Sequence, residues 1–240
     1  MKINKKSFIN LLKKAYLGEL NDELIIQFQE NFIKIPFWQN GICGIITKEN
    51  SPQTPFEMVV VNVTNLLKQM SILDEEFEMS FVESQNRFIQ MKDKKFENNY
   101  RLSDKSLLQN DHLKIYEFQE PPYDIKMDFG QEFVKDILDM KSTIKSDETT
   151  SIQLKSMGEK KLEFILGDYN KIKYKTEFEK LNKNSLEINS KFNFQKFISL
   201  LEQIKDVKSG TIFYKKPFIK IQAQCGDDVN VNYFIVQNQN

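Results

Sequence analysis

FNFQKFISLLEQI at residues 192–204 and TIFYKKPFIKIQAQCGDDVNVNYFIV at residues 211–236 contain the pattern that decides the fold. The first stretch predicts an α-helix that begins at Phe192 or Asn193. Its apolar side chains recur at the spacing of one helical face: Phe194, Phe197, Ile198 and Leu201. Runs rich in β-branched and aromatic residues in the second stretch predict strands at 211–214, 218–224 and 230–236. The GDD sequence predicts a hairpin turn between the last two strands. The two stretches therefore predict a helix followed by antiparallel strands.

The same combination of a helix and strands occurs three more times along the chain. Apolar stripes of period 3.6 predict helices over 4–17, 62–72 and 128–146, the last with Phe133, Ile137, Met140 and Ile144 in register. Alternating or β-rich runs predict the strands 24–28, 31–37, 42–47, 57–61, 77–83, 87–92, 96–108, 151–155, 161–166, 171–178 and about 186–190. Corresponding helices lie roughly 125 to 130 residues apart, so the order of elements indicates an internal duplication.

QNDHLKIYEFQEPPY at residues 109–123 separates the two halves. It has no long periodicity, and its Pro-Pro pair cannot continue a helix or a central strand. We therefore predict an N-terminal domain at 1–108, a linker at 109–123 and a C-terminal domain at 124–240. The expected class is α+β, with two similar domains that each pack two helices on antiparallel sheets.

The composition limits the possible functions. Of the 240 residues 40% are hydrophobic, and Lys plus Arg equals Asp plus Glu at 34 each, so any affinity for nucleic acid must come from the arrangement of charge. Cys43 and Cys225 have no short spacing, which gives no zinc, haem or disulfide signature. No signal-peptide core is present, and no run approaches the roughly 18 apolar residues of a membrane span. A soluble, intracellular protein is expected.

Enzymatic motifs are missing from the sequence. It has no glycine-rich phosphate loop, GxSxG, HExxH or CxxC, and its acidic clusters fall at the ends of predicted elements or in turns. The one histidine, His112, lies in the predicted linker, where a surface position is expected. We therefore expect no catalytic residues, no metal and no cofactor.

The polar faces of the four predicted helices carry lysines and amides. Opposite each apolar stripe, and with no acid in that window, lie Lys6, Asn10 and Lys13 in the first helix, Lys68 in the second, Lys135 in the third, and Lys196 and Gln203 in the fourth. The helical segments together carry a charge of about +6 and the rest of the chain about −6. Such lysines are usually just a solvated surface, but four helices that share them would form a face suited to phosphate contact without sequence preference.

The quoted stretches, together with MDFGQEFVKDILDMKSTI at 127–144 and LEFILGDYNKIKYK at 162–175, resemble the DNA sliding clamps of the eukaryotic, archaeal and T4-like phage type. The N-terminal half resembles them only in the order and length of its elements. The resemblance implies a DNA-clamp fold and a non-enzymatic processivity factor. It also implies a ring, usually a homotrimer, whose helices surround double-stranded DNA. DNA polymerase and a clamp loader would be the partners, and the helical lysines would line the hole.

The resemblance also implies two contact surfaces. Partner peptides would bind an apolar pocket near the linker, formed by Phe37, Ile42, Ile115, Phe118, Pro217 and Tyr233. Phe37, Ile42 and Tyr233 could equally be core residues, whereas Ile115 and Phe118 would be exposed if nothing covers them. Ring closure would pair the strand edge at about 96–107 with the edge at 171–178 of the next subunit, although lysines there could instead deter aggregation.

Two alternatives remain open. Relatives are often acidic and this chain is neutral, so it could be a clamp-fold processivity factor that binds DNA without a closed ring. It could also be a clamp-derived interaction subunit, for example in transcription. The composition, rich in Lys, Asn, Ile and Phe, favours a phage or other virus, which would place the protein in the cytoplasm of a bacterial host; otherwise it would act wherever DNA is replicated.

Overall fold

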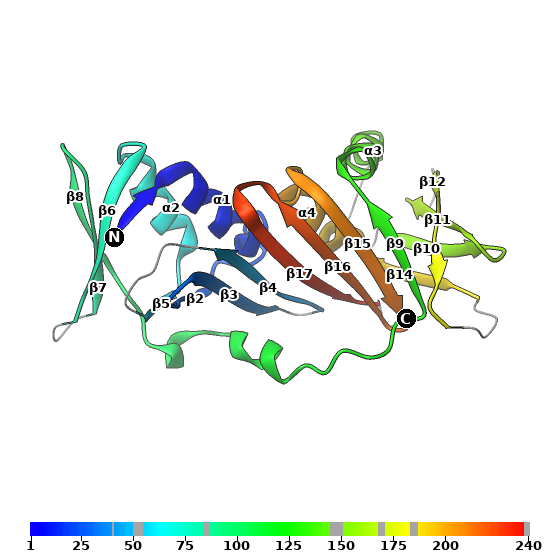
Figure 1. Cartoon of the computed structure of the whole chain (residues 1–240), viewed down its shortest axis with the longest axis horizontal. Helices are drawn as coiled ribbons and strands as arrows, with labels where there is room; N and C mark the ends of the chain where they lie inside the picture. The colour runs from blue at the N-terminus through cyan, green and yellow to red at the C-terminus, as the bar shows by residue number, and fades with distance from the viewer. Residues whose placement is uncertain are drawn as a thin grey trace. The chain divides into compact units, whose positions relative to one another are not determined.

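The computed structural model describes residues 1–39, 41–49, 55–83, 87–144, 151–167, 171–182 and 187–237. They form two compact units (Figure 1). Unit 1 comprises Met1–Gln39, Gly44–Glu117 and Asp227–Val229, and unit 2 comprises Asn40–Cys43, Phe118–Gly226 and Asn230–Asn240.

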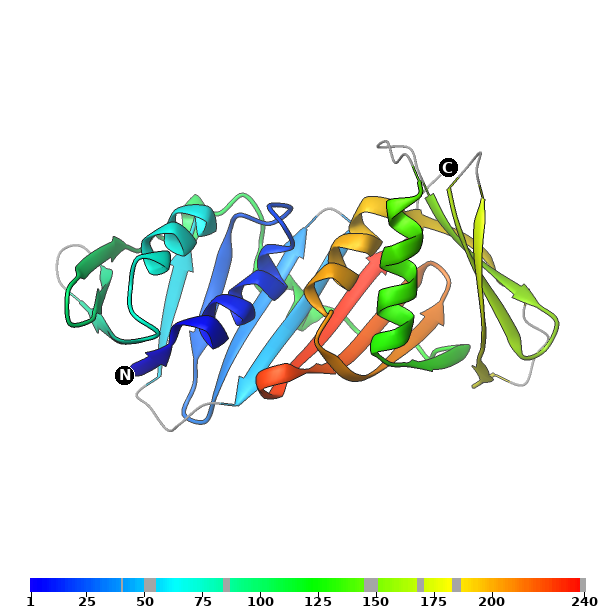
Figure 2. The same ribbon diagram turned by 90° about the horizontal axis from the view of Figure 1, so that it is seen from above.

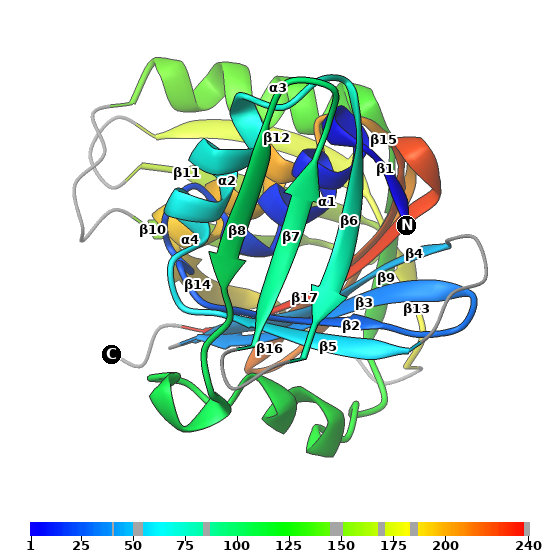
Figure 3. The same ribbon diagram turned by 90° about the vertical axis from the view of Figure 1, so that its left-hand side faces the viewer.

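Unit 1 contains two antiparallel sheets and two α-helices. Its elements are β1 (Lys2–Asn4), α1 (Lys5–Tyr16), β2 (Leu24–Phe28), β3 (Phe32–Gln39), β4 (Ile42–Glu49), β5 (Phe56–Val60), α2 (Val63–Ser71), β6 (Glu76–Val82), β7 (Phe88–Lys92), β8 (Glu97–Arg101) and the short 3-10 helices η1 (Lys105–Leu107) and η2 (His112–Glu117). One sheet has the order β1-β6-β7-β8, seen face-on in Figure 3, and β4-β3-β2-β5 are adjacent in the other. The helices lie on one face of the latter strands and η2 on the opposite face (Figures 1 and 3).

The apolar stripe of α1 explains its position. Phe8, Leu11, Leu12 and Ala15 are all buried, as the period of 3.6 predicts. The helix begins at an Asn4 cap whose Oδ1 accepts a hydrogen bond from the backbone N–H of Ser7 at 2.9 Å, which satisfies one of the free donors of the first turn. Asn62 caps α2 in the same way, over 2.6 Å.

Unit 2 repeats this arrangement. Its elements are β9 (Ile125–Phe129), α3 (Gln131–Ser142), β10 (Ser151–Met157), β11 (Lys161–Leu166), β12 (Ile172–Glu177), β13 (Glu179–Lys180), β14 (Asn189–Asn193), α4 (Phe194–Gln203), β15 (Val207–Lys215), β16 (Phe218–Cys225), η3 (Gly226–Asp228) and β17 (Val229–Val236). One sheet has the order β12-β11-β10-β14, and β13-β9-β15-β16-β17 are adjacent in the other. Both helices lie over one face of the latter strands (Figure 2).

The core of unit 2 follows from strand register. Ile212 of β15 pairs with Ile221 of β16, which pairs with Tyr233 of β17, and all three side chains are buried. Because side chains alternate along a strand, the intervening residues point to the opposite face. Phe194, Phe197 and Leu201 of α4 are buried as well.

The predicted α+β class is confirmed, with two helices and antiparallel sheets in each unit. Several elements differ in extent from the prediction. The third helix begins at Gln131 after an unpredicted strand, β9, and Ile144 lies beyond its end. The predicted strand 96–108 ends at Arg101 and is followed by η1. The predicted linker contains η2. Residues 145 and 146 of the third predicted helix, and residue 186 of the predicted strand 186–190, lie outside the described residues.

Candidate nucleic-acid interface and partner surface

The helices of unit 1 present lysine and no acid. The sequence of α1 contains four lysines and that of α2 one. Lys6, Lys13 and Lys68 are exposed and Asn10 is half-buried. We call these three exposed lysines the unit 1 lysines. The ammonium of Lys5 is used differently, because it donates to the carbonyl oxygen of Leu73 just after α2.

The helices of unit 2 carry a mixed face. Lys135 is exposed, but Glu132 and Asp139 are exposed too, at i−3 and i+4, the positions that neighbour Lys135 on a helix. Lys141 of α3 and Glu202 of α4 form an ion pair at 2.6 Å. The face of α3 that was predicted to lack acids is therefore narrow, and carboxylates lie beside it.

Lys196 and Gln203 of α4 are both half-buried. Burial lowers the pKa of the Lys196 ammonium, since a charge is less stable away from water. A Cβ atom at Gly41 would lie 2.9 Å from Lys196 Nζ, so the glycine leaves room for this ammonium. The positive helical surface of the chain thus lies mainly on α1 and α2.

Most of the predicted pocket residues are buried. Phe37 of unit 1 and Ile42 and Tyr233 of unit 2 belong to the core. Ile115 would be exposed only if nothing covered it, but it is 4% exposed because it lies in η2, which packs on β3. Phe118 is half-buried and Pro217 is exposed. Only the last two present surface to a partner in this structure.

Unit 2 carries an aromatic surface on the face of its sheet opposite the core. Phe213 pairs in register with Lys220, and Lys220 pairs with Phe234. Phe218 lies two residues before Lys220 and therefore on the same face. The Lys220 ammonium is 5.7 Å from the ring centroids of both Phe213 and Phe234, within cation–π range. We call these four residues the aromatic platform.

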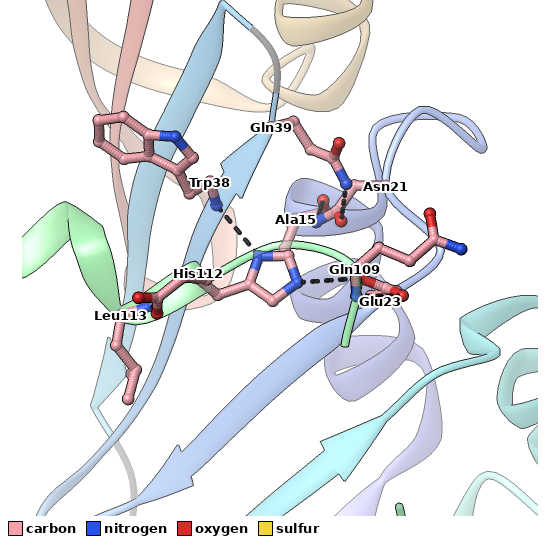
Figure 4. Close-up of polar contacts among 9 residues, drawn as sticks. Ala15, Asn21, Glu23, Trp38, Gln39, Gln109, His112 and Leu113 are labelled. Carbon is pink, nitrogen blue, oxygen red and sulfur yellow. Dashed lines mark hydrogen bonds and ion pairs between the residues drawn. The ribbon is translucent and has the colours of Figure 1, made fainter. Parts of the chain in front are cut away.

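His112, drawn with its polar contacts in Figure 4, is fully buried. This corrects the predicted surface position. His112 contacts β3, the strand whose Ile33 pairs with Phe28 of β2. Farther along β3, the backbone N–H of Trp38 donates to Nδ1 of His112 at 3.1 Å. Because Nδ1 accepts, the proton of the neutral ring is assigned to Nε2. Burial lowers the pKa of His112, and nearby Glu23 and Asp111 oppose that shift.

Glu23 links the predicted linker to the start of β2. Its carboxylate oxygens accept the backbone N–H of Gln109 at 3.1 and 3.0 Å, and one of them lies 3.7 Å from His112 Nε2. Nearby, the side chain of Gln39 donates to Asn21 Oδ1 at 2.8 Å, and Asn21 donates to the carbonyl of Ala15 at 2.9 Å. This polar cluster positions the linker by hydrogen bonds, and it offers no nucleophile paired with a base.

Each unit has a sheet that ends in an edge strand, β8 in unit 1 and β12 in unit 2. Tyr100 of β8 points toward α2, where its hydroxyl donates to the carbonyl of Asn62 at 3.0 Å. Tyr174 of β12 points toward α3, with its ring 5.3 Å from that of Phe133. On the other face of β12, Lys173 and Lys175 each lie 3.6 Å from the buried carboxylate of Glu163.

Within the part of the chain that the structure describes, no group of three His, Cys, Asp or Glu side chains could hold a metal ion. Among the same residues, no helix is long and apolar enough to cross a membrane.

No family model matches the sequence, and no curated protein matches it. Solved structures do. A PCNA2–PCNA3 complex from Sulfolobus tokodaii aligns with a TM-score of 0.70 and 14% identity over 99% of both chains. Proliferating cellular nuclear antigen from Entamoeba histolytica aligns with a TM-score of 0.73 and 11% identity over 99% of this chain and 98% of that one. PCNA from Thermococcus kodakaraensis aligns with a TM-score of 0.71 and 11% identity over 98% of each chain.

Proposed function

We propose that this chain, which has the sliding-clamp fold, is a non-enzymatic DNA sliding clamp. It encircles double-stranded DNA as a homotrimer, moves along it without sequence specificity, and tethers DNA polymerase and other replication proteins. A clamp loader opens and closes the ring. The observation that carries the proposal is the lysine-bearing, acid-free helical face of unit 1 within this fold.

The unit 1 lysines suit backbone contact. Lys6, Lys13 and Lys68 are exposed on helices whose sequences contain no acidic residue. An ammonium attracts phosphate oxygens as a point charge and carries no sequence information by itself. A small number of such contacts gives weak, salt-sensitive binding. Binding of this kind lets a clamp move along DNA.

Pairing of edge strands is the proposed means of ring closure. In the proposal, β8 of one protomer pairs with β12 of the next, since an edge strand carries backbone groups that can join another strand. Tyr100 and Tyr174 already point toward the helices of their own units. Such pairing would extend each helix-covered sheet across the subunit boundary without turning a core residue outward.

Partner proteins would dock on unit 2. Phe118 and Pro217 retain surface there, and the aromatic platform lies on the same unit. Aromatic side chains are common anchors at protein interfaces. We propose that DNA polymerase and the clamp loader each bind this surface of unit 2 through a short segment.

A second function has an observation in its favour. The helices of unit 2 carry Glu132 and Asp139 beside Lys135, which favours a clamp-fold protein that contacts DNA through unit 1 alone, or an interaction subunit that closes no ring. Light scattering after gel filtration separates the two proposals. A ring of three predicts three times the chain mass of 28.4 kDa. A stable mass of one chain at high protein concentration would rule out the homotrimer.

A further inference from the structure

The aromatic platform of unit 2 is covered by the chain itself. In β17, Val231, Tyr233 and Ile235 are buried on the core face. Phe234 points to the opposite face because side chains alternate, yet it is only 4% exposed. A side chain on the outer face of a sheet can be buried only if something lies over it.

The cover is the segment Phe118–Tyr123, FQEPPY. The Phe118 ring meets Phe234 edge-on at 5.0 Å between centroids and Phe218 at 5.5 Å. The carboxylate of Glu120 accepts hydrogen bonds from Lys220 Nζ at 2.9 and 2.8 Å. Tyr123 lies 5.1 Å from Phe213. Each member of the platform therefore has a partner in the segment.

The segment has the character of a bound linear peptide. It contains no helix or strand, and Pro121-Pro122 favours an extended backbone. Its anchors are an aromatic ring, a carboxylate two residues later and a second aromatic three residues after that. Aromatic contacts combined with one partly exposed ion pair hold a segment in place, but they can exchange for equivalent contacts from another chain.

We propose that the aromatic platform is a docking site for partner peptides of the pattern aromatic-x-acid-x-x-aromatic, and that Phe118–Tyr123 is its built-in, displaceable occupant. The inference rests on the proposed function and names the peptide class and the regulation of its partner surface. A tethered segment competes at an effective concentration on the order of millimolar. A partner therefore binds only if its peptide outcompetes FQEPPY, which excludes weak ligands.

A peptide-binding experiment tests this proposal. The probe is a fluorescein-labelled peptide of residues 116–124, YEFQEPPYD, and fluorescence anisotropy measures its affinity for the full chain. In the double variant Phe118→Ala, Glu120→Gln the built-in occupant loses two anchors while the platform is intact. We expect this variant to bind the peptide at least about tenfold more tightly than the unaltered protein does. Equal or weaker binding by the variant would overturn the proposal.

Two further variants define where the peptide binds. Gln119→Ala changes an exposed residue of the same segment and should leave peptide affinity unchanged. Adding Lys220→Met to the double variant should remove the gained affinity, because the peptide carboxylate loses its partner. If the gain persists, the peptide binds elsewhere and the proposal is wrong.

A single charge reversal keeps the test decisive if the double variant folds poorly. Glu120→Lys alters one partly exposed side chain opposite Lys220 and should still increase peptide binding, because the new lysine repels Lys220 and displaces the built-in segment. No increase in a folded Glu120→Lys protein would refute the proposal. None of these readouts involves DNA, so the docking site could fail while the clamp function holds, or hold while ring closure fails.

Discussion

The backbone N–H of Trp38 donates to Nδ1 of His112 at 3.1 Å, which joins the only tryptophan of the chain to its only histidine. Trp38 lies on β3 and His112 begins η2. The bond therefore attaches the predicted linker to β3 of unit 1. It also makes the indole a built-in reporter of that attachment.

Removing the imidazole should loosen this attachment. His112→Ala leaves the Trp38 N–H without its acceptor and opens a cavity in place of a fully buried ring, and an unsatisfied buried donor alone costs about 1–3 kcal/mol. We expect the free energy of unfolding in urea to fall by at least this amount, with a change in Trp38 fluorescence. His112→Asn, which retains a short acceptor, should lose less. Equal losses in the two variants would contradict the role of the hydrogen bond.

The same bond predicts a pH dependence. Burial holds the pKa of His112 below its ordinary value of 6.5, so the unfolded chain binds a proton more readily than the folded one. The stability from the neutral ring is fully present above pH 6.5 and is lost as the pH falls through the folded pKa. The unfolding free energy of the unaltered protein, measured between about pH 5 and 7, should decrease toward acid relative to that of His112→Asn. Parallel curves would show that the pKa of His112 is the same in the folded and the unfolded chain, and would contradict this prediction.

Neutralising the unit 1 lysines should weaken DNA binding more than neutralising Lys135. The triple variant Lys6→Gln, Lys13→Gln, Lys68→Gln removes three charges from helices without acids, whereas Lys135 has Glu132 and Asp139 beside it. The slope of log affinity against log salt should fall by up to about 2.7 for the triple variant. The matched control is a second triple variant, Lys34→Gln, Lys94→Gln, Lys95→Gln, which changes the net charge by the same amount. An equal effect of both triple variants would argue against a helical DNA face.

Helix caps give a stability prediction that is independent of function. Asn193 Oδ1 accepts the backbone N–H of Lys196 at 2.9 Å at the start of α4, so Asn193→Ala should lower the unfolding free energy by about 1 kcal/mol. Gly130, at the start of α3, has no side-chain cap. Gly130→Asp should raise stability by a few tenths of a kcal/mol. Thermal unfolding of both variants checks the opposite signs.

Long periodic segments could be predicted from the sequence, because one helical or strand face determines their burial. The stripes of α1 and α4 are examples. β1 and β9 could not be predicted in this way: β1 has three residues and is defined by its pairing with β6, and β9 by its pairing with β15. Short strands exist through partners that are distant in sequence.

The candidate sites were predicted less completely. A helical wheel finds the ridge opposite the core, but carboxylates beside that ridge, such as Asp139, share the solvated face. His112 and Ile115 lie in a stretch without periodicity, and their burial comes from packing against β3 and Glu23. The sequence contains one signal for the aromatic platform. Phe213, Lys220 and Phe234 lie at alternate strand positions that are otherwise occupied by polar residues, and aromatic residues there need a covering partner.

Topological retention on DNA tests the central claim most directly. The protein is incubated with a linear duplex held on a support at one end, the free end is then closed with a bulky bound protein, and the support is washed in high salt to remove electrostatic contacts. A closed ring that has threaded onto the duplex stays bound through the wash and is released when a restriction enzyme cuts the DNA beside the block. If the protein washes away equally from blocked and open DNA, although three chains associate in solution, it does not encircle DNA.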